Sequence, residues 1–589
     1  MRPTNYKIMI NCRRFFVFVI LPVLWLGTAG LTSFELLPSL SSGVIQTDTI
    51  QPVRAPHGMV VSASIHASTV GSDVLAAGGN AVDAAIATGF ALAVTHPAAG
   101  NIGGGGFMVI RFPDGTTTAI DFREKAPMAA HPDMWLDDSG EYSRTMHHNS
   151  HMAVGVPGTV AGFWKAHRLY GSRDWKRLVS PAVELAGDGF NITERLAGGL
   201  RRLVEGRGAA YEGTVAYFSA NGSPLNPGHR LVQSDLSRTL ERIANKGRDG
   251  FYKGETARLL TAEMKREGGI ITAEDLSLYR AKERTPMKGT YRGYEIISMP
   301  PPSSGGIALI EMLNILEGYD LRSMGHNSSD YISHLTEAMR RAYRDRARFV
   351  ADPDFVDVPV HRLTSKAYAE SLRSEIDPLK ASISEPSDIT EAYESKETTH
   401  YSVVDSDGMA VSVTYTLEYG YGSAITVPGA GFLLNNEMGD FNPGLGLTNA
   451  DGLIGTVPNL ARPEQRMLSS MTPSIVAKDG ELVAVVGSPG GRAIINIVLQ
   501  VILNFVEFEM NIQEAVNAAR IHHQWLPDYV RIEEGGVTAA TVTKLENQGY
   551  KISVRGEQGR ANSIMIDPDN GDRLGAADLR NVDARAVGN

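Results

Sequence analysis

Thr398 stands where a polar segment gives way to the pattern of a β-hairpin. The preceding residues, 383–397, carry few apolar anchors, which predicts an exposed loop. Residues 401–404 and 409–416 read as two strands joined by a turn. If the bond between Glu397 and Thr398 is cut, the free α-amine of Thr398, with an unperturbed pKa of about 7.7–8.0, can take the hydroxyl proton and create a nucleophile. A loop that enters a hairpin without any chemistry explains these residues alone at least as well.

The segment 398–405 resembles the start of the small subunit in the γ-glutamyltransferase family (γ-glutamyltranspeptidases), whose members are N-terminal-nucleophile hydrolases. Further segments match the same family in the family's order, from about Gly58 to the C-terminus. These segments are residues 78–85, 103–107, 121–124, 302–306, 433–441, 468–473, 487–491 and 522–527. The combination is highly specific, because a chance match to all of them in one order is not credible.

The resemblance implies an α+β protein with the four-layer αββα fold of N-terminal-nucleophile hydrolases, in which a large and a small subunit form one globular unit. Hydrophobic periodicity alone predicts only a mixture of helices and strands. Helices are expected at residues 66–77, 81–94, 329–349 and 494–506, and strands at 106–112, 117–122, 294–298, 401–404, 409–416, 431–434, 474–477 and 482–486. The helix at 329–349 carries apolar residues on one side and many arginines on the other.

By family precedent, the hydroxyl of Thr398 first attacks the carbonyl of Glu397, and hydrolysis of the resulting ester releases the α-amine. The resemblance therefore implies a large subunit, 31–397, and a small catalytic subunit, 398–589, which stay together as a heterodimer. The released amine then acts as a general base, which contributes typically ~10²–10⁴ in rate. Thr399 is expected to pack in the strand. Thr416, at the end of the second hairpin strand, holds the family position that hydrogen-bonds the nucleophile.

Gly490 and Gly491 follow an apolar strand and precede a helix. A glycine turn at this place presents unpaired backbone N–H groups. The resemblance implies that these groups form the oxyanion hole for a tetrahedral intermediate. A purely structural strand-to-helix turn is the alternative that the two glycines alone leave open.

The resemblance implies a γ-glutamyl substrate, whose α-carboxylate and α-ammonium lie away from the amide bond that is cut. A guanidinium binds a carboxylate through two hydrogen bonds, and carboxylates complement an ammonium. The expected carboxylate ligands are Arg123, Ser469 and Ser470, and the expected ammonium ligands are Glu437 and Asp440. An ordinary ion pair and simple turn carboxylates are the alternatives for these charged residues taken singly.

Two positions depart from the family pattern. Glu418 stands where many members have an asparagine near the amino end of the substrate, which adds one negative charge. The segment 442–467 keeps the length of the lid loop that covers the pocket in several members, but Asp451 lies about where some of those lids carry an aromatic gate residue. Lid closure and the balance of hydrolysis against transfer are therefore open.

The activity that the resemblance implies is cleavage of the γ-glutamyl amide of glutathione and related compounds through an ester on Thr398. The acyl group then passes to water or to an amino-acid or dipeptide acceptor. A cephalosporin (glutaryl-type) acylase on the same scaffold and a non-catalytic exported relative are the alternatives. Retention of the expected amino-acid ligands counts against the first, and retention of Thr398 and Arg123 counts against the second.

The N-terminus reads as an export signal. Basic residues precede an apolar run at 15–26, and small residues follow at 27–30. Residues 1–30 are therefore expected to direct the chain to the periplasm or outside the cell, with an uncleaved anchor as the alternative. Cys12, the only cysteine of the chain, lies within this segment, so no disulfide is expected in the mature form.

Nucleic acid, metal and cofactor binding are not expected. The net charge is −10, without a basic cluster. His522 and His523 are adjacent, so their side chains point in different directions, and no third ligand is patterned nearby. The glycine run 103–106 follows a helix and enters a strand, which reverses the context of a dinucleotide fingerprint.

Overall fold

The computed structural model describes residues 51–385, 398–447, 449–450 and 455–589, which belong to one unit, Ile50–Asn589. The export segment 1–30, most of the predicted loop 383–397 together with Glu397, and Asp451 of the predicted lid lie outside the described residues. Within the described part of the chain, no helix combines the length and the apolar character that a membrane span requires.

Two seven-stranded antiparallel sheets form the centre of the described unit. In strand order, the first consists of β21 (Arg585–Gly588), β2 (Met59–Ser62), β12 (Thr399–Val404), β13 (Ala410–Thr416), β3 (Gly105–Arg111), β4 (Thr117–Phe122) and β9 (Lys282–Arg284). The second consists of β1 (Val53–Ala55), β20 (Arg573–Ala577), β19 (Asn562–Ile566), β15 (Glu481–Val486), β14 (Ser474–Lys478), β11 (Tyr294–Ser298) and β10 (Met287–Tyr291). Strands from both ends of the chain therefore complete each sheet.

The inner strands of the first sheet, from β2 to β4 in strand order, are buried on both faces. In β3, Met108 and Ile110 pack into one hydrophobic core with helices, whereas Phe107 and Val109 pack into another with the second sheet. Successive side chains of a strand point to opposite faces, so a strand between two cores reads as a continuous apolar run. For this reason, apolar and polar residues do not alternate in the sequence of β3.

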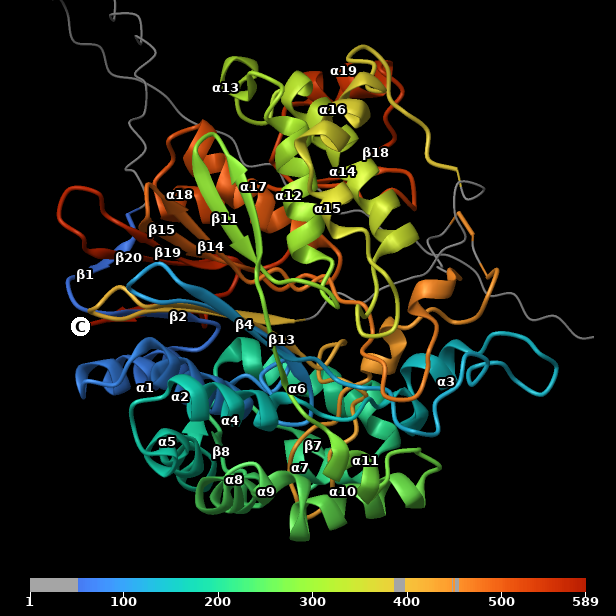
Figure 1. Ribbon diagram of the computed structural model, residues 1–589. Coiled ribbons are helices and arrows are strands. Elements are labelled where there is room, and N and C mark those ends of the chain that lie inside the picture. The colour runs from blue at the N-terminus through green and yellow to red at the C-terminus, as the bar shows by residue number, and fades with distance from the viewer. Residues whose placement is uncertain (1–50, 386–397, 448, 451–454) are drawn as a thin grey trace, which may run out of the picture. The chain divides into compact units, whose positions relative to one another are not determined.

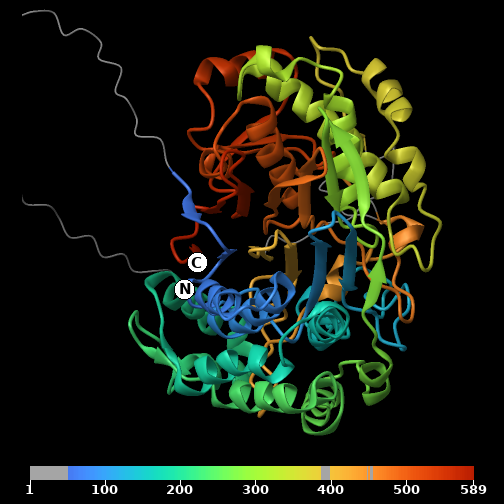
Figure 2. The same ribbon diagram turned by 60° about the vertical axis from the view of Figure 1, so that its left-hand side comes forward.

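Helices cover the outer face of each sheet (Figures 1 and 2). Below the first sheet in Figure 1 lie α1 (Ile65–Ala76), α2 (Ala81–Thr95), α4 (Thr159–Tyr170), α5 (Trp175–Asp188), α6 (Glu194–Glu205), α7 (Glu212–Phe218), α8 (Ser234–Lys246), α9 (Asp249–Tyr252), α10 (Gly254–Arg266) and α11 (Ala273–Leu278). Above the second lie α12 (Gly305–Leu316), α13 (Leu321–Met324), α14 (Ser329–Phe349), α15 (Val360–Leu363), α16 (Lys366–Ser374), α17 (Ala493–Glu507), α18 (Ile512–Asn517) and α19 (Ala539–Asn547). The predicted four-layer αββα arrangement is confirmed.

The remaining elements lie outside these layers. A three-stranded sheet is formed by β16 (Ile521–His522), β17 (Val530–Glu533) and β18 (Ile552–Arg555). The short helix α3 (Arg144–His148) lies beside the segment that follows β13.

The hairpin and the four predicted helices are confirmed to within one or two residues, but the strand predicted at 431–434 is wrong. In this segment, one isolated bridge joins Leu433 to Thr426. Gly429 and Gly431 have φ angles of 74° and 76°, and the N–H groups of Ala430 and Gly431 both donate to the carbonyl of Val427. The chain therefore turns at this segment, although its apolar residues follow the pattern of a strand.

Three arginines of α14, which the sequence presents as part of a polar face, are buried. Arg341 pairs with Glu337 on the same helix at 2.7 Å, and Arg340 pairs with Asp528. The exposed fractions of Arg340, Arg341 and Arg346 are 5%, 4% and 3%. Carboxylates on α14 itself and on another segment, together with hydroxyl groups, pair with these buried guanidinium groups and offset the cost of burying them.

Helix α2 begins with a reciprocal cap that stabilises the layer under the first sheet. The side chain of Asn80 accepts a hydrogen bond from the N–H of Asp83 at 2.9 Å, and Asp83 accepts one from the N–H of Asn80 at 3.1 Å. Asn80→Ala is expected to lower the free energy of unfolding by about 1–2 kcal/mol, measured by urea unfolding. Asn80→Ser keeps a capping oxygen and should retain most of this stability. Equal stability of wild type and Asn80→Ala would contradict the role of the cap.

Candidate active site

The hairpin places two threonines side by side where the inner strands β12 and β13 of the first sheet meet at one end. Thr399 pairs with Tyr415, so Thr398 lies one residue beyond the last pair, opposite Thr416. Thr398 Oγ1 lies 3.4 Å from Thr416 Oγ1, a long hydrogen bond for two hydroxyls. Thr416 Oγ1 also accepts a hydrogen bond from the N–H of Glu418 at 2.9 Å. The side chain of Thr398 is buried, and strand pairing fixes its position.

The glycine run before β3 lets the chain approach Thr416 closely. Asn101 donates to the carbonyl of Thr416 at 2.9 Å, and its side-chain oxygen accepts the N–H of Gly104 at the same distance. A Cβ on Gly104 would lie 2.1 Å from the Thr416 carbonyl oxygen. The run therefore serves close backbone packing. The sequence did not single out Asn101, because an asparagine before glycines is typical of many turns.

Gly490 and Gly491 form a tight turn in front of α17, with φ angles of 140° and 57°. Their carbonyls accept the N–H groups of Ala493 and Ile494. Among the described residues, neither glycine N–H has a hydrogen-bond acceptor. Gly491 lines the cavity that contains Thr398, and Gly490 adjoins it in the chain. One of these two backbone donors, that of Gly491, therefore belongs to the wall of the cavity, and the other is its neighbour in the chain.

One cavity gathers nearly all the residues that the sequence singled out. It is lined by Arg123, Thr398, Thr416, Glu418, Glu437, Asp440, Ser469, Ser470, Met471, Gly491 and Ile494. These residues come from the ends of β4, β12 and β13, from the segment after Leu433, from the loop before β14 and from the start of α17. Gly490 is the predicted functional residue near this cavity that does not line it.

Arg123 lies at the centre of a buried charge cluster. Its guanidinium contacts the carboxylates of Glu437 and Asp440, and it donates to the carbonyls of Met467 at 3.3 Å and Leu468 at 3.1 Å. Although burial lowers the pKa of Arg123, the neighbouring carboxylates outweigh this effect and raise it above its ordinary value. The sequence predicted Arg123 and these carboxylates as opposite ends of a ligand site, whereas the structure pairs them directly.

Three carboxyl groups surround the single guanidinium of this cluster. Besides Glu437 and Asp440, Glu124 lies 3.6 Å from Arg123 Nη1. Burial raises the pKa values of Glu124 and Glu437 to about 8, and Arg123 opposes this rise only in part. Both carboxyls are therefore mostly protonated at pH 7, and a cation brought into the cavity would lower their pKa values and favour their ionised forms.

The two serines of the cavity are held by elements that the sequence analysis did not assign to the site. The carbonyl of Ser469 accepts from the N–H and the hydroxyl of Ser304, at 2.8 and 2.7 Å. Arg346 of α14 donates to Ser304 Oγ at 2.8 Å and to Ser470 Oγ at 3.0 Å. Arg346 was missed because α14 reads as an amphipathic helix with a solvated arginine face.

Glu418 is held in an uncommon conformation, with a φ angle of 76°. Its Oε1 lies 3.2 Å from Nδ1 of His148. Burial, followed by His147 and Arg144, lowers the pKa of His148 far below its ordinary value, so the neutral ring donates its Nδ1–H to the carboxylate. His148 was missed because nothing in the sequence links α3 to Glu418.

Asn459 joins the two ends of the predicted lid segment to the site. Its side-chain amide donates to the carbonyl of Asp440 at 2.7 Å, and its side-chain oxygen accepts the N–H of Leu468 at 2.9 Å. Asp440 and Leu468 both contact Arg123. Asn459 therefore connects the predicted lid segment to the charge cluster around Arg123.

The adjacent histidines hydrogen-bond with separate partners in the core. His522 Nδ1 lies 2.8 Å from the side-chain nitrogen of Asn496, and His523 Nε2 lies 3.1 Å from Asp528 Oδ1. Across the described ranges, no group of three or more His, Cys, Asp or Glu side chains is arranged to hold a metal ion.

Known proteins are similar to this chain in sequence and in fold. The family model described as gamma-glutamyltranspeptidase matches residues 67–588. The glutathione hydrolase proenzyme of Escherichia coli (strain K12) is 49% identical over 554 residues, which cover 94% of this chain and 95% of the relative. The crystal structure of the cephalosporin acylase from Bacillus halodurans superimposes with a TM-score of 0.81 at 26% identity and covers 93% of this chain and 98% of its own.

The crystal structure of Helicobacter pylori gamma-glutamyltranspeptidase is 45% identical, with a TM-score of 0.54, and covers 58% of this chain and 95% of its own. The family model thus spans most of the chain, and the relative from Escherichia coli matches over nearly its whole length. The chain belongs to the gamma-glutamyltranspeptidase family.

Proposed function

We propose that this protein is an autoprocessed glutathione hydrolase and γ-glutamyltransferase in which Thr398 is the N-terminal nucleophile. The observation that carries the proposal is the position of the buried Thr398 hydroxyl in the same cavity as Arg123 and its carboxylates. The name of the Escherichia coli relative, a glutathione hydrolase proenzyme, supports both the substrate class and the processing.

The reaction begins when the α-amine of Thr398 takes the proton of its own hydroxyl. The oxygen attacks the γ-carbonyl of the substrate, and the N–H groups of Gly490 and Gly491 stabilise the oxyanion. The proton passes to the leaving amine, and a γ-glutamyl ester remains on Thr398. Water or the amine of an amino acid or dipeptide then attacks this ester. Thr416 orients the nucleophile through the contact between the two hydroxyls.

Recognition of the donor uses both signs of charge in the cavity. The α-carboxylate binds Arg123, Ser469 and Ser470, and the α-ammonium binds Glu437, Asp440 and Glu418. Arg123 already contacts two carboxylates. When the α-carboxylate of the substrate binds Arg123, the substrate ammonium has to replace part of the contact between Arg123 and these two carboxylates. The raised pKa values of Glu437 and Glu124 support this exchange, because an ammonium beside these carboxyls would favour their ionised forms.

Maturation is expected to cut the chain once, between Glu397 and Thr398. The Thr398 hydroxyl must attack the preceding carbonyl before its amine is released, so the uncut chain lacks the catalytic base. Gel electrophoresis should show two chains that copurify, and sequencing of the smaller should begin Thr-Thr-His-Tyr. A single uncut chain with full activity would contradict this prediction.

The acylase alternative rests on the close superposition with the cephalosporin acylase of Bacillus halodurans. The purified protein should be assayed on a γ-glutamyl anilide and on the matching glutaryl anilide, each with and without a dipeptide. We expect turnover of the γ-glutamyl compound, stimulated by the dipeptide, and little turnover of the glutaryl compound. Faster release from the glutaryl anilide would favour the acylase.

We also propose that residues 1–30 export the protein to the periplasm or the medium. The apolar run between basic and small residues supports this location. Cell fractionation tests it: the full-length chain should be found outside the cytoplasm, and a chain that lacks residues 1–30 should stay in the cytoplasm.

A further inference from the structure

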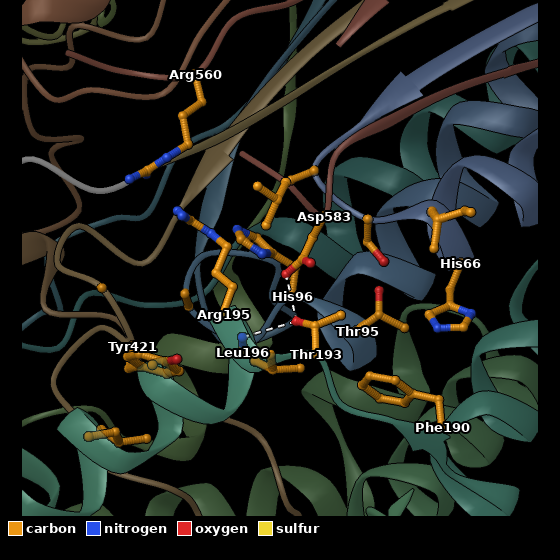
Figure 3. Close-up of a pocket in the computed structure, with 18 of the residues that line it drawn as sticks. His66, Thr95, His96, Phe190, Thr193, Arg195, Leu196, Tyr421, Arg560 and Asp583 are labelled. Carbon is orange, nitrogen blue, oxygen red and sulfur yellow. Dashed lines mark hydrogen bonds between the residues drawn. The ribbon is translucent and has the colours of Figure 1, made fainter. Parts of the chain in front are cut away.

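A second cavity, of about 640 Å³, has none of its described lining residues in common with the cavity around Thr398. Its walls come from the start of α1, the end of α2, helix α6, the loop at Tyr421 and the segments around Arg560 and Asp583 (Figure 3). Its volume lies within the range of pockets that bind small organic ligands, roughly 300–1,000 Å³.

Positive charge dominates the lining of this cavity. Among the described residues that line it, the charged ones are Arg195, Arg202, Arg207, Arg560, Arg585 and one acid, Asp583. Arg207 donates to the carbonyls of Gly420 and Gly422, both at 2.7 Å, and Arg585 donates to neighbouring carbonyls. The carbonyl oxygens accept hydrogen bonds from these guanidinium groups but do not neutralise their positive charge.

Arg195 and Arg560 direct their guanidinium groups toward the same space, above His96 (Figure 3). Within the described part of the chain, the Arg560 side chain has no ion pair, and its buried Nε has no hydrogen-bond acceptor. Burial, followed by Arg560 and Arg195, lowers the pKa of His96 to about 4, so its ring is neutral at pH 7. Two cations that face one space create a strong attraction for an anion there.

The carboxylate of Asp583 does not neutralise the excess of positive charge in this cavity. Its carboxylate accepts a hydrogen bond from Thr193 Oγ1 at 2.9 Å, on the other side of His96 from Arg560 in Figure 3. Apolar side chains, including Phe190 and Leu196, complete the lining. The cavity thus combines a cationic end with an apolar wall, which suits an organic anion better than a bare inorganic one.

We propose that this cavity binds a small organic anion with two or more carboxylates, held by the guanidinium groups of Arg195 and Arg560. A carboxylate accepts two parallel hydrogen bonds from a guanidinium, and a second carboxylate reaches Arg202 or Arg585 on the same lining. The ligand is separate from the donor substrate, because the two cavities have different walls.

The proposed site shares loops with the active site. The N–H of Arg560 donates to Ser488 Oγ at 3.2 Å, just before the turn Gly490–Gly491. The N–H of Tyr421, which follows Glu418 by three residues, donates to the carbonyl of Ala98 at 2.7 Å. An anion bound against Arg560 and Tyr421 therefore lies behind two loops that line the catalytic cavity.

The test is calorimetric titration of the mature protein with citrate, at an ionic strength held constant with sodium chloride. We expect saturable binding at one site per molecule. Arg560→Gln and Arg202→Gln should each weaken binding by at least roughly tenfold, because each removes a charged hydrogen-bond donor. Arg201→Gln is the matched control: Arg201 is the exposed neighbour of Arg202 on α6 and does not line the cavity, so its affinity should equal that of wild type.

Three results would overturn the proposal. The first is absence of saturable citrate binding up to about 10 mM. The second is equal affinity of wild type, Arg202→Gln and Arg560→Gln, with thermal unfolding confirming that the variants are folded. The third is tighter binding of inorganic phosphate than of citrate, which would replace the carboxylate class with phosphate. None of these measurements depends on turnover, so they stand apart from the proposed catalytic function.

Discussion

Replacement of Thr398 by alanine is expected to yield one uncut chain without measurable turnover. The same residue supplies the hydroxyl that attacks the preceding carbonyl and the amine that becomes the base, so one substitution removes both steps. Loss of the base alone would cost about 10²–10⁴ in rate, and loss of the nucleophile removes the covalent route entirely. Gel electrophoresis and a γ-glutamyl anilide assay on the purified variant measure the two effects.

Thr399→Ala is the matched control for this prediction. Thr399 is the first residue of β12, and its side chain is buried. Among the described residues, its hydroxyl has no hydrogen-bond partner, so alanine removes an unsatisfied polar group at little cost. We expect normal cutting and activity close to wild type. If both variants behaved alike, or if Thr399→Ala alone blocked the cut, the nucleophile would have to be assigned to Thr399.

Local patterns predicted the elements that carry the nucleophile. Apolar and polar residues alternate in β12 and β13, on either side of a short polar turn, and this pattern predicted the hairpin. The turn also determines the register of the two strands. The same reasoning failed at 431–434, where apolar residues occur in a chain that glycines turn back on itself. Periodicity detects which residues are buried, and it does not distinguish a buried strand from a buried turn of the same composition.

The sequence did not predict the contacts between side chains that lie far apart in the chain. Arg123 and Asp440 are separated by 317 positions, and no local rule states that their side chains meet. Arg346 is a clearer case, because its helix obeys amphipathic spacing, and yet the arginine contacts Ser470 at the active site. Identity of the site residues came from the family resemblance, whereas their contacts with Arg346, His148 and Asn459 required the fold.

Arg123→Ala is expected to lower kcat/KM for a γ-glutamyl amide by at least roughly tenfold to a hundredfold, because a hydrogen bond to a charged group contributes about 1.5–3 kcal/mol. The structure adds a second cost. Without Arg123, the pKa values of Glu437 and Glu124, already raised by burial, should rise further, and protonated carboxyls attract the ammonium less. The substitution therefore weakens both halves of donor recognition.

Controls separate this effect from a folding defect. The cut before Thr398 should remain largely intact in Arg123→Ala, because maturation attacks a peptide bond of the chain itself and does not involve the donor. Arg123→Lys should restore activity in part, since lysine keeps the charge but lacks the planar fork. Equal activity of wild type and Arg123→Ala on the γ-glutamyl amide would overturn the assignment. Equal turnover of a glutaryl amide, which lacks the ammonium, would instead identify the protein as an acylase.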